Sequence, residues 1–497
     1  MYIFTFIKNI FNYIIYFYSL YKFLQYKDTK YSNIYLNRLE NAIYNCGPIG
    51  IKLVQLLIMY EGALPADSIQ KLKYTLEKCK VHSWNITKDL YYNNFNRDIS
   101  DDFDLYYDCE VDVDEDLVVD ENWGLSDGFD LDYDYMYDHN DKIIGSGSIG
   151  QVYKLFSKEI NAYVAVKVRH PTIEADIYEF TKIVNFIMKY ILKYINIPYK
   201  NLINLFVENI NIQKDFKNEA LNTIKLRANF IEDNIIVPEI YKYSTDFIIM
   251  SYHKGIDISA IDNKYKFAVY NDINFMTLSS IMVYDFLHAD LHDGNVKIEI
   301  LENNKYNIIV YDCGLVVSTN KTSYMRDLIF ILITAQYHKF PNVLINLYNK
   351  SNNATYNDKI DKMNKFIDNI TVDTIKPADR AVAIMKYSVD NNIIADNSVV
   401  NLLISNIMSS TINKKSADKI QKYVNSEPNK PDPGVLLNLY KGILDKTQRF
   451  KKLNEVFNNY INDDNVCQDV YKEWSIDNFG HDDKSIIVDI ICKYFGY

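Results

Sequence analysis

Cysteine is scarce in this chain and never occurs as a closely spaced pair. The six cysteines among 497 residues stand at positions 46, 79, 109, 313, 467 and 492, without a CxxC motif or a Cys/His cluster at metal-ligand spacing. This pattern argues against a structural zinc site and indicates an intracellular, reducing compartment. Cys313, the one thiol within a candidate site, is interpreted as a packing residue rather than a reactive thiol.

The sequence also lacks an apolar run long enough to span a membrane. Residues 1–24 are apolar and aromatic, but their uninterrupted core extends only from about Tyr13 to Tyr18, short of the ~20 residues that a spanning helix needs. The interrupting polar residues are Lys8, Asn9, Asn12 and Lys22. Two interpretations of segment 1–30 stay open. It is either a membrane-surface helix or weak signal anchor, which would associate the protein with a membrane, or a buried or frayed amphipathic helix.

Lysine and arginine are absent between Asp98 and Asp141, a segment with eighteen acidic residues. Since the net charge is −11, the rest of the chain is net positive, and the protein is not uniformly acidic. The run at Asp130-x-Asp132-x-Asp134 lacks the glycine and the glutamate that an EF-hand loop requires at its sixth and twelfth positions. We interpret 98–141 as a solvated, disordered insertion, with docking on a basic partner as the alternative. No nucleic-acid surface is predicted.

The most informative segment that is present runs from His288 to Asn295 and reads HADLHDGN. It is followed at Asp312 by Asp-Cys-Gly within an apolar run. An aspartate five residues before an asparagine, with a second aspartate soon after, is how kinase-like folds gather oxygens around magnesium and phosphate. We therefore predict that Asp290 is catalytic, orienting an acceptor hydroxyl or water, and that Asn295 and Asp312 bind Mg²⁺. His288 and His292 are interpreted as structural imidazoles, because kinase chemistry needs neither as a base.

A second motif lies upstream, in the order that kinases use. The sequence from Gly145 to Val152 fits GxGxxGxV, and Val-Ala-Val-Lys167 follows. A glycine loop between strands lets backbone N–H groups approach phosphates, and the lysine supplies a point charge for the α and β oxygens. A dinucleotide-binding fold would instead place a helix after the glycines. The predicted ATP-binding residues are Gly145, Ser146, Gly147, Ser148, Gly150, Val152 and Lys167, and Lys167 is also assigned a catalytic role.

Before the acidic segment, residues 33–80 are predicted to form three helical pieces, separated by Gly47-Pro48 and by Gly62 to Pro65. Lys52 and Gln55 lie three residues apart and therefore share one helix face. Taken alone, they form a polar face and nothing more.

Together these pieces resemble the UbiB/aarF-domain atypical kinases, a family linked to coenzyme Q biosynthesis in bacteria and mitochondria. The family combines a helical extension bearing a KxGQ motif with SIGQV, VAVKV, DFxxEAxN, VPxxYxxST, HADxHxGN and DxGLV segments. The corresponding segments are Lys52 to Gln55, Ser148 to Val152, Val164 to Val168, Asp215 to Asn222, Val237 to Thr245, His288 to Asn295 and Asp312 to Val316. The resemblance covers roughly Tyr35 to Ile345.

The resemblance implies an α+β, bilobal protein-kinase-like fold with an N-terminal helical extension and a largely helical C-lobe. It implies ATP and Mg²⁺ as cofactors, and it adds Lys52, Gln55, Glu219 and Met250 to the expected nucleotide site. The predicted organisation is an apolar segment at 1–30, an extension at 31–97, the acidic insertion at 98–141, an N-lobe at 142–255 and a C-lobe at 256–497.

Departures from the family pattern affect the glycine loop, the KxGQ motif and the family's glutamate position. The family's loop is usually rich in alanine, whereas Gly145 and Gly147 make this loop more like that of ordinary kinases. Val54 replaces the glycine of KxGQ, and its bulk is expected to push the extension away from any backbone packed against it. Gln213 stands where many members carry a glutamate, which leaves Glu219 as the better carboxylate partner for Lys167 or Lys52.

Two further segments bear on the reaction. Residues Ile248 to Gly255 are predicted to form the hinge between lobes, where Met250 either contacts adenine or packs in the core. After Gly314 no APE signature appears where a protein kinase would place its peptide-binding segment. This favours an ATPase or a kinase of an unknown, small or lipidic acceptor. A serine/threonine protein kinase and a nucleotide-binding pseudokinase scaffold are the alternatives.

Overall fold

The computed structural model divides the chain into two compact units, each built from discontinuous sequence. The first unit contains Met1–Ile224 and Pro238–His253, and the second contains Lys225–Val237 and Lys254–Tyr497. The structure describes residues 2–26, 29, 31–59, 72, 81–105, 142–190, 200–230, 234–262, 286–289, 291, 293–302, 305–317, 337–348 and 354–370, together with single positions between 265 and 284 and between 383 and 393.

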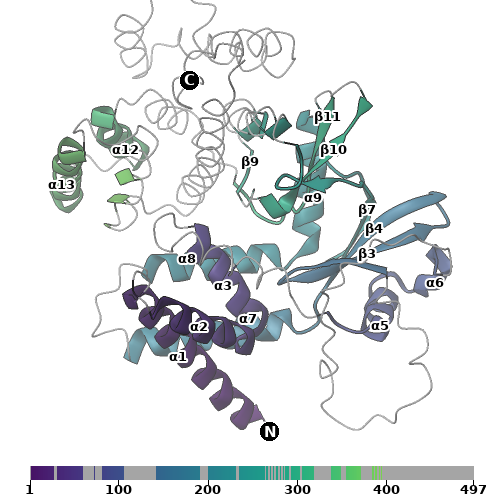
Figure 1. Ribbon diagram of the computed structural model, residues 1–497, viewed down its shortest axis with the longest axis horizontal. Coiled ribbons are helices and arrows are strands. Elements are labelled where there is room, and N and C mark those ends of the chain that lie inside the picture. Colours follow the sequence, from purple (N-terminus) through teal and green to yellow (C-terminus); the bar gives the residue numbers. More distant parts are fainter. Residues whose placement is uncertain are drawn as a thin grey trace, which may run out of the picture. The chain divides into compact units, whose positions relative to one another are not determined.

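An antiparallel sheet organises the first unit (Figure 1). Its strands follow the order β1-β3-β4-β7-β6, and β2 also pairs with β3. They are β1 (Phe103–Asp104), β2 (Ile143–Ser146), β3 (Gly150–Ser157), β4 (Ala162–Arg169), β6 (Ile240–Tyr243) and β7 (Phe247–Ser251). Valine and aromatic side chains in β3 and β4 suit a half-buried pleated surface. Asn161 turns the chain between these two strands with φ +55°, a left-handed conformation that asparagine tolerates.

The segment that precedes the acidic run folds onto this sheet. Helices α5 (Trp84–Phe95) and α6 (Ile99–Asp102), both labelled in Figure 1, lead into β1, and β1 pairs with the edge of β3. Trp84 and Phe103 are buried in the same hydrophobic cluster as the sheet residues Tyr153 and Phe247. These aromatic side chains cover one face of the sheet and remove it from water.

This arrangement corrects the predicted start of the acidic insertion. Asp98 is not its first disordered residue, because a capping box between Asp98 and Asp101 begins α6. Phe103 and Leu105 are buried, and Phe103 pairs with Ser157. The prediction failed because a short edge element needs few apolar residues, so a high acidic content did not exclude ordered structure. Residues 106–141 lie outside the described part of the chain.

Helices gather in a second cluster within the first unit (Figure 1). They are α1 (Tyr2–Tyr26), α2 (Ser32–Asn45), α3 (Gly47–Met59), α7 (Ile173–Tyr190) and α8 (Lys200–Gln213). Gly47, the first residue of α3, follows the end of α2 with φ +64°, as glycine does after a helix end. A Cβ on Gly50 would lie 2.6 Å from Cys46 Cβ and 2.9 Å from Ile43 O of α2, so the two helices meet more closely than a side chain allows. The predicted break at Gly47-Pro48 is confirmed. The third predicted helical piece falls almost entirely on undescribed residues.

Helix α1 combines features of both interpretations given for the N-terminus. Tyr13, Tyr16 and Phe23 are buried in the helical cluster, so one face of the helix packs on the protein. The other face carries large exposed apolar residues, namely Phe11, Ile14, Ile15, Tyr18 and Tyr21. Among the described helices, none has the length and hydropathy that crossing a membrane requires.

The second unit contains two small sheets. The larger has the order β5-β11-β10-β8, and the smaller pairs β12 with β9. These strands are β5 (Ile235–Ile236), β8 (Ile256–Asp257), β9 (Leu287–His288), β10 (Val296–Ile300), β11 (Tyr306–Val310) and β12 (Val316–Val317). The helix α9 (Phe216–Phe230) passes from the first unit into the second, and its residues Leu226 and Phe230 join the core around β10 and β11.

The predicted helical C-lobe is represented by a few elements. These are the short 3-10 helices η4 (Asp293–Asn295) and η6 (Tyr337–Lys339) and the helices α12 (Phe340–Tyr348) and α13 (Ala354–Ile370). Helix α13 buries Tyr356, Ile360, Met363 and Ile367 at helical spacing. Most residues after 370 lie outside the described part of the chain.

Candidate functional site

The glycine motif forms the connection between β2 and β3. Gly145 and Ser146 end β2, Gly150 begins β3, and Gly147 and Ser148 lie in the turn between them. The Gly147 N–H donates to Gly150 O at 2.9 Å and closes the turn. The predicted phosphate-binding residues of the motif are therefore together in one hairpin, in which Val152 lies on β3.

The three glycines of this motif face different steric demands. A Cβ on Gly150 would lie 2.4 Å from Val168 O and 2.9 Å from Phe216 Cζ, so the backbone approaches too closely for a side chain. A Cβ on Gly145 would meet no atom within 4 Å. Gly147 has open space apart from one contact at 3.7 Å. Packing therefore requires glycine at 150 but at neither of the other two positions.

Replacing Gly150 by alanine is expected to lower the free energy of unfolding by about 2 kcal/mol, because strand β4 and the Phe216 ring would have to shift. Gly145→Ala is the matched control and should change the unfolding midpoint little. Urea unfolding of both variants measures the difference. Equal stability of the two variants would contradict the tight packing at Gly150.

Lys167 lies on β4, directly across from Val152 on β3 and from Ile248 on β7. Its Nζ is 2.7 Å from Glu219 Oε1 in the first turn of α9. The two side chains are only 12% and 5% exposed, and the Lys167 ammonium lies 5.1 Å from the centre of the Phe216 ring. Glu219 is therefore the carboxylate beside Lys167, one of the two partners that the sequence predicts for this glutamate.

Gln213, at the family's glutamate position, makes no such contact. It is buried at the end of α8, and its Oε1 accepts no hydrogen bond within the part of the chain that the structure describes. Lys52 and Gln55 both lie on α3, and Lys52 is half-buried. The side chain of Gln55 is outside the described residues. Val54 is completely buried in the helical cluster, which accommodates its bulk.

The predicted hinge at Ile248 to Gly255 is only partly a connection. Its first residues belong to β7, which pairs with β4 and β6 on its two sides. Met250 is half-buried and packs against the cluster of Phe216, Ala220 and Ile248, as its core interpretation predicts. The chain leaves the first unit after His253, so the connection follows the strand.

In the second unit, antiparallel pairing brings two predicted ligand residues close together. Val296 on β10 pairs with Val310 on β11, and the Tyr311 N–H donates to Asn295 O at 2.9 Å. Asn295 therefore lies beside the residue that precedes Asp312. The buried His288 Nε2 is 3.2 Å from Tyr311 O, which connects β9 to the same strand end and supports a structural role for this histidine. Asp290 and His292 lie outside the described residues.

Asp312 has an uncommon backbone conformation. Its φ is +53°, in the left-handed region, and its Oδ1 accepts a hydrogen bond from the Gly314 N–H at 3.2 Å. Short polar side chains tolerate this region because they bond to the local backbone. Non-glycine residues held there cluster at functional sites. The side chain is exposed, so it is accessible to a ligand from solvent.

The chemistry of Asn295 and Asp312 fits a magnesium ion that arrives with its substrate. Among the described residues, no group of three or more His, Cys, Asp and Glu side chains is arranged to hold a metal. Magnesium, however, usually keeps several waters and binds through one or two carboxylates together with substrate phosphates. One carboxylate and one amide oxygen are thus sufficient protein ligands for this mode of binding.

A pair of buried histidines contacts the glycine hairpin and was missed in the sequence. His170 Nε2 lies 3.0 Å from Gly147 O, and His170 Nδ1 lies 2.9 Å from His82 Nδ1. Burial lowers the pKa of His82 to about 3 and that of His170 to about 4, so both rings are neutral near pH 7. Since the two residues are 88 positions apart, no local pattern could have joined them.

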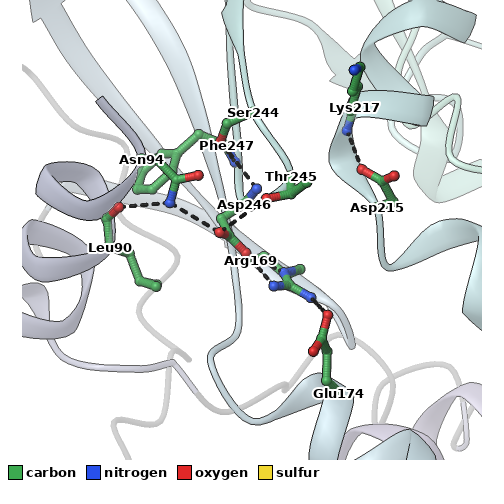
Figure 2. A network of polar contacts seen from close by, with 10 residues as sticks. All are labelled: Leu90, Asn94, Arg169, Glu174, Asp215, Lys217, Ser244, Thr245, Asp246 and Phe247. Atoms are coloured by element: carbon green, nitrogen blue, oxygen red, sulfur yellow. Dashed lines mark hydrogen bonds and ion pairs between the residues drawn. The ribbon is translucent and has the colours of Figure 1, made fainter. Parts of the chain in front are cut away.

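A polar network around Asp246 fastens the sheet to its neighbouring helices. Figure 2 shows Asp246 between Asn94 of α5 and Arg169 of β4, and Arg169 also contacts Glu174 of α7. Arg169 Nε lies 2.6 Å from Asp246 Oδ1, and Asn94 Nδ2 lies 3.0 Å from Oδ2. The Arg169 and Asp246 side chains are 15% and 16% exposed, so solvent screens their ion pair only partly.

Asp246→Ala should lower the free energy of unfolding by about 2 kcal/mol, because it leaves the largely buried Arg169 charge without this carboxylate. Thermal or urea unfolding measures the change. Asp358→Ala, which removes a solvent-exposed ion pair with Lys362, is the control and should have no measurable effect. A similar, small effect in both variants would show that the Asp246 network contributes no more than a surface pair.

Two features define an α+β, kinase-like protein. The first unit has an antiparallel sheet with a glycine hairpin and with Lys167 paired to Glu219. In the second unit, Asn295 and Asp312 lie next to the paired strands β10 and β11. Comparison with protein families agrees. Residues 127–344 match the model of the ABC1 atypical kinase-like domain. Residues 127–344 are therefore similar to this domain, and the resemblance to the UbiB and AarF-domain kinases is confirmed.

Relatives share modest identity with this chain. A "Probable protein kinase UbiB" from Photobacterium profundum is 25% identical over 317 residues, which are 61% of this chain and 52% of the relative. An "AarF domain-containing kinase 1" from Drosophila melanogaster is 30% identical over 191 residues, 36% of this chain and 37% of the relative. The chain thus spans about half the length, or less, of these curated relatives. A solved structure titled "The complex structure of Rv3197-erythromycin from Mycobacterium tuberculosis" matches with 17% identity and a TM-score of 0.32, covering 56% of this chain and 76% of that chain.

Proposed function

We propose that this chain binds Mg-ATP and transfers or hydrolyses the γ-phosphate. The observation that carries the proposal is the buried ion pair between Lys167 and Glu219. An ammonium held by a carboxylate on a strand next to a glycine hairpin is suited to bind α and β phosphates of a nucleotide. Lys167 would make this contact, and the hairpin from Gly145 to Gly150 would cover the phosphates.

Sequence motifs in the second unit carry the other groups that we propose for the reaction. Asn295 and Asp312 would hold Mg²⁺, which neutralises charge that develops on the phosphate oxygens. Asp290 would orient the attacking hydroxyl or water. Because a phosphoryl group transfers with little covalent help from the protein, positioning and charge are the main contributions expected of these residues.

The acceptor is proposed to be small or lipidic rather than a peptide. The short segment after Gly314 lacks an APE signature, and a protein kinase would build its peptide platform there. Water is the acceptor if the protein is an ATPase. A serine/threonine protein kinase and a pseudokinase scaffold remain the competing functions.

The deciding experiment measures ADP release and nucleotide-induced thermal stabilisation of the purified full chain, with Mg²⁺ and with EDTA. Mg²⁺-dependent release is expected, and addition of lipid extracts or generic protein substrates then identifies the acceptor class. Stabilisation by ATP without turnover would favour the scaffold. Absence of both effects would contradict the nucleotide site.

We also propose that α1 lies on a membrane surface through its exposed face. Phe11 and Tyr18 are each 59% exposed, and the Lys22 ammonium lies 5.8 Å from the centre of the Tyr18 ring. Aromatic side chains beside a lysine suit the boundary between headgroups and acyl chains.

The variant Phe11→Ser/Tyr18→Ser should reduce flotation with anionic vesicles at least fivefold, because it removes exposed apolar area and leaves the buried face intact. Tyr92→Ser, at an exposed aromatic residue of α5, is the control. Unchanged flotation of the double variant would refute the role of this face.

A further inference from the structure

A buried chain of hydrogen bonds runs through the first unit to the glycine hairpin. In order, it joins Gln151, Tyr153, Thr87, His82, His170 and the Gly147 carbonyl. The Thr87 Oγ1 atom is 3.0 Å from both Tyr153 Oη and His82 Nε2. Each of the five side chains is at most 1% exposed, so water does not compete for these bonds.

The carbonyl at the end of this chain determines where the protons are. Gly147 O only accepts, so His170 Nε2 must carry the hydrogen. In the neutral ring, His170 Nδ1 is then an acceptor, and His82 Nδ1 must donate to it. His82 Nε2 therefore accepts from the Thr87 hydroxyl. The two rings are in opposite tautomers, and one arrangement satisfies every bond.

The backbone around His82 is fastened to the same strand. The Gln151 side-chain amide donates to His82 O at 3.0 Å, and its Oε1 accepts from the His82 N–H at 2.8 Å. Gln151 belongs to the SIGQV motif on β3, so the hairpin strand itself holds His82. Hydrogen bonds to both the backbone and the ring of His82 thereby fix the position of its imidazole.

His170 contacts the hairpin at two points. Its Nε2–H reaches Gly147 O, and its backbone N–H donates to Ile149 O at 2.8 Å. In a trans peptide the C=O and the next N–H point in opposite directions. Holding Gly147 O on His170 therefore turns the Ser148 N–H away from the imidazole.

We propose that His82 is a positioning residue for the glycine hairpin. By donating to His170 Nδ1 it holds the tautomer whose Nε2–H fixes the Gly147 carbonyl, and it thereby orders the loop for nucleotide phosphates. That nucleotide phosphates are the ligand rests on the proposed function. That His82 orders the loop does not, because loop order can be measured in the protein without nucleotide.

The test compares His82→Leu, which cannot donate, with His82→Asn, whose Nδ2 retains a donor near the position of Nδ1. Val164→Ala, in the same hydrophobic cluster but outside the hydrogen-bond chain, controls for lost stability. For each full-length variant, hydrogen exchange of residues 145–151 is measured without nucleotide, and the Kd for Mg-ATP is measured by calorimetry. We expect faster exchange and an about fivefold weaker Kd for His82→Leu, with His82→Asn and Val164→Ala within twofold of the unaltered protein.

Each outcome has a separate meaning. Unaltered loop exchange in His82→Leu, or equal effects in Val164→Ala, overturns the positioning role. Faster exchange with an unchanged Kd overturns its relevance to nucleotide binding. If the unaltered protein binds no Mg-ATP while His82→Leu loosens the loop, the proposed function fails and the control of the loop by His82 stands.

A spectroscopic measurement tests the tautomers directly. Long-range ¹H–¹⁵N correlation spectra should show the hydrogen on Nδ1 of His82 and on Nε2 of His170 at pH 7. The same tautomer in both rings would overturn the proposal, because the chain then has no donor between them. Two imidazoles that only pack against apolar side chains, without a hydrogen bond between them, would not be held in opposite tautomers.

Discussion

Asp312→Asn is expected to reduce Mg²⁺-dependent ATP turnover by about 100- to 1,000-fold while leaving the fold intact. Replacing the carboxylate by an amide removes a full negative charge from the proposed magnesium site. The fold should tolerate the change for a reason specific to this position. Asparagine adopts the left-handed backbone conformation of Asp312 readily, and its Oδ1 still accepts the hydrogen bond from Gly314.

The measurement is ADP release at saturating Mg-ATP, with thermal unfolding of the same samples. Asp257→Asn, which changes an exposed carboxylate of the second unit, is the matched control and should keep full turnover. If Asp312→Asn hydrolyses ATP as fast as the unaltered protein, Asp312 does not hold the catalytic metal. A fall in turnover together with unfolding would instead assign it a structural role.

The second large effect is expected from the ion pair of Lys167 and Glu219. Glu219→Ala should lower the free energy of unfolding by about 2–4 kcal/mol, because it leaves the Lys167 charge largely buried without this carboxylate. Lys167→Met should destabilise the protein similarly, since Glu219 is only 5% exposed. Both variants should lose at least 100-fold in turnover, as the phosphate contact depends on a correctly held ammonium.

The combined variant Lys167→Met/Glu219→Leu separates stability from function. Replacing a buried pair by apolar side chains of similar volume is often neutral, and Met can pack on the Phe216 ring as Lys167 does. We expect its urea unfolding midpoint to recover most of the loss while turnover stays at the level of Lys167→Met. Recovered turnover would identify Lys167 as an ordinary strand lysine, and additive losses of stability would show that the two residues do not interact.

Predictions from local motifs were the most accurate. The glycine motif predicted a loop between two strands and placed Lys167 on the next strand, and the structure agrees, because each motif spans only a few residues whose backbone pairing is local. Glu219 was expected, through the family's DFxxEAxN segment, to pair with Lys167 or with Lys52, and the structure shows the pair with Lys167. The roles of these residues in catalysis stay predictions, as do those of Asp290 and Gln55, which the described side chains do not include.

The boundary of the acidic segment could not be read from composition. Asp98 to Leu105 looked like the start of a solvated insertion, yet Phe103 pairs with an edge residue of β3 and Leu105 is buried. Composition averages over a window, whereas an edge strand of two residues depends on a single partner. The capping box at Asp98 and Asp101 was the one local signal that could have placed a helix there.

The sequence by itself determined the kinase-like class, the phosphate- and metal-binding candidates and the break between α2 and α3, because these depend on residue types at short spacings. The tertiary structure alone decided that His82 meets His170, that Asp246 joins Asn94 to Arg169, and that α1 is buried on one side and exposed on the other. These contacts join residues at least 77 positions apart, or depend on which helix face meets a neighbour. Burial makes these polar contacts important for stability, because a polar or charged group removed from water must find its partner within the fold.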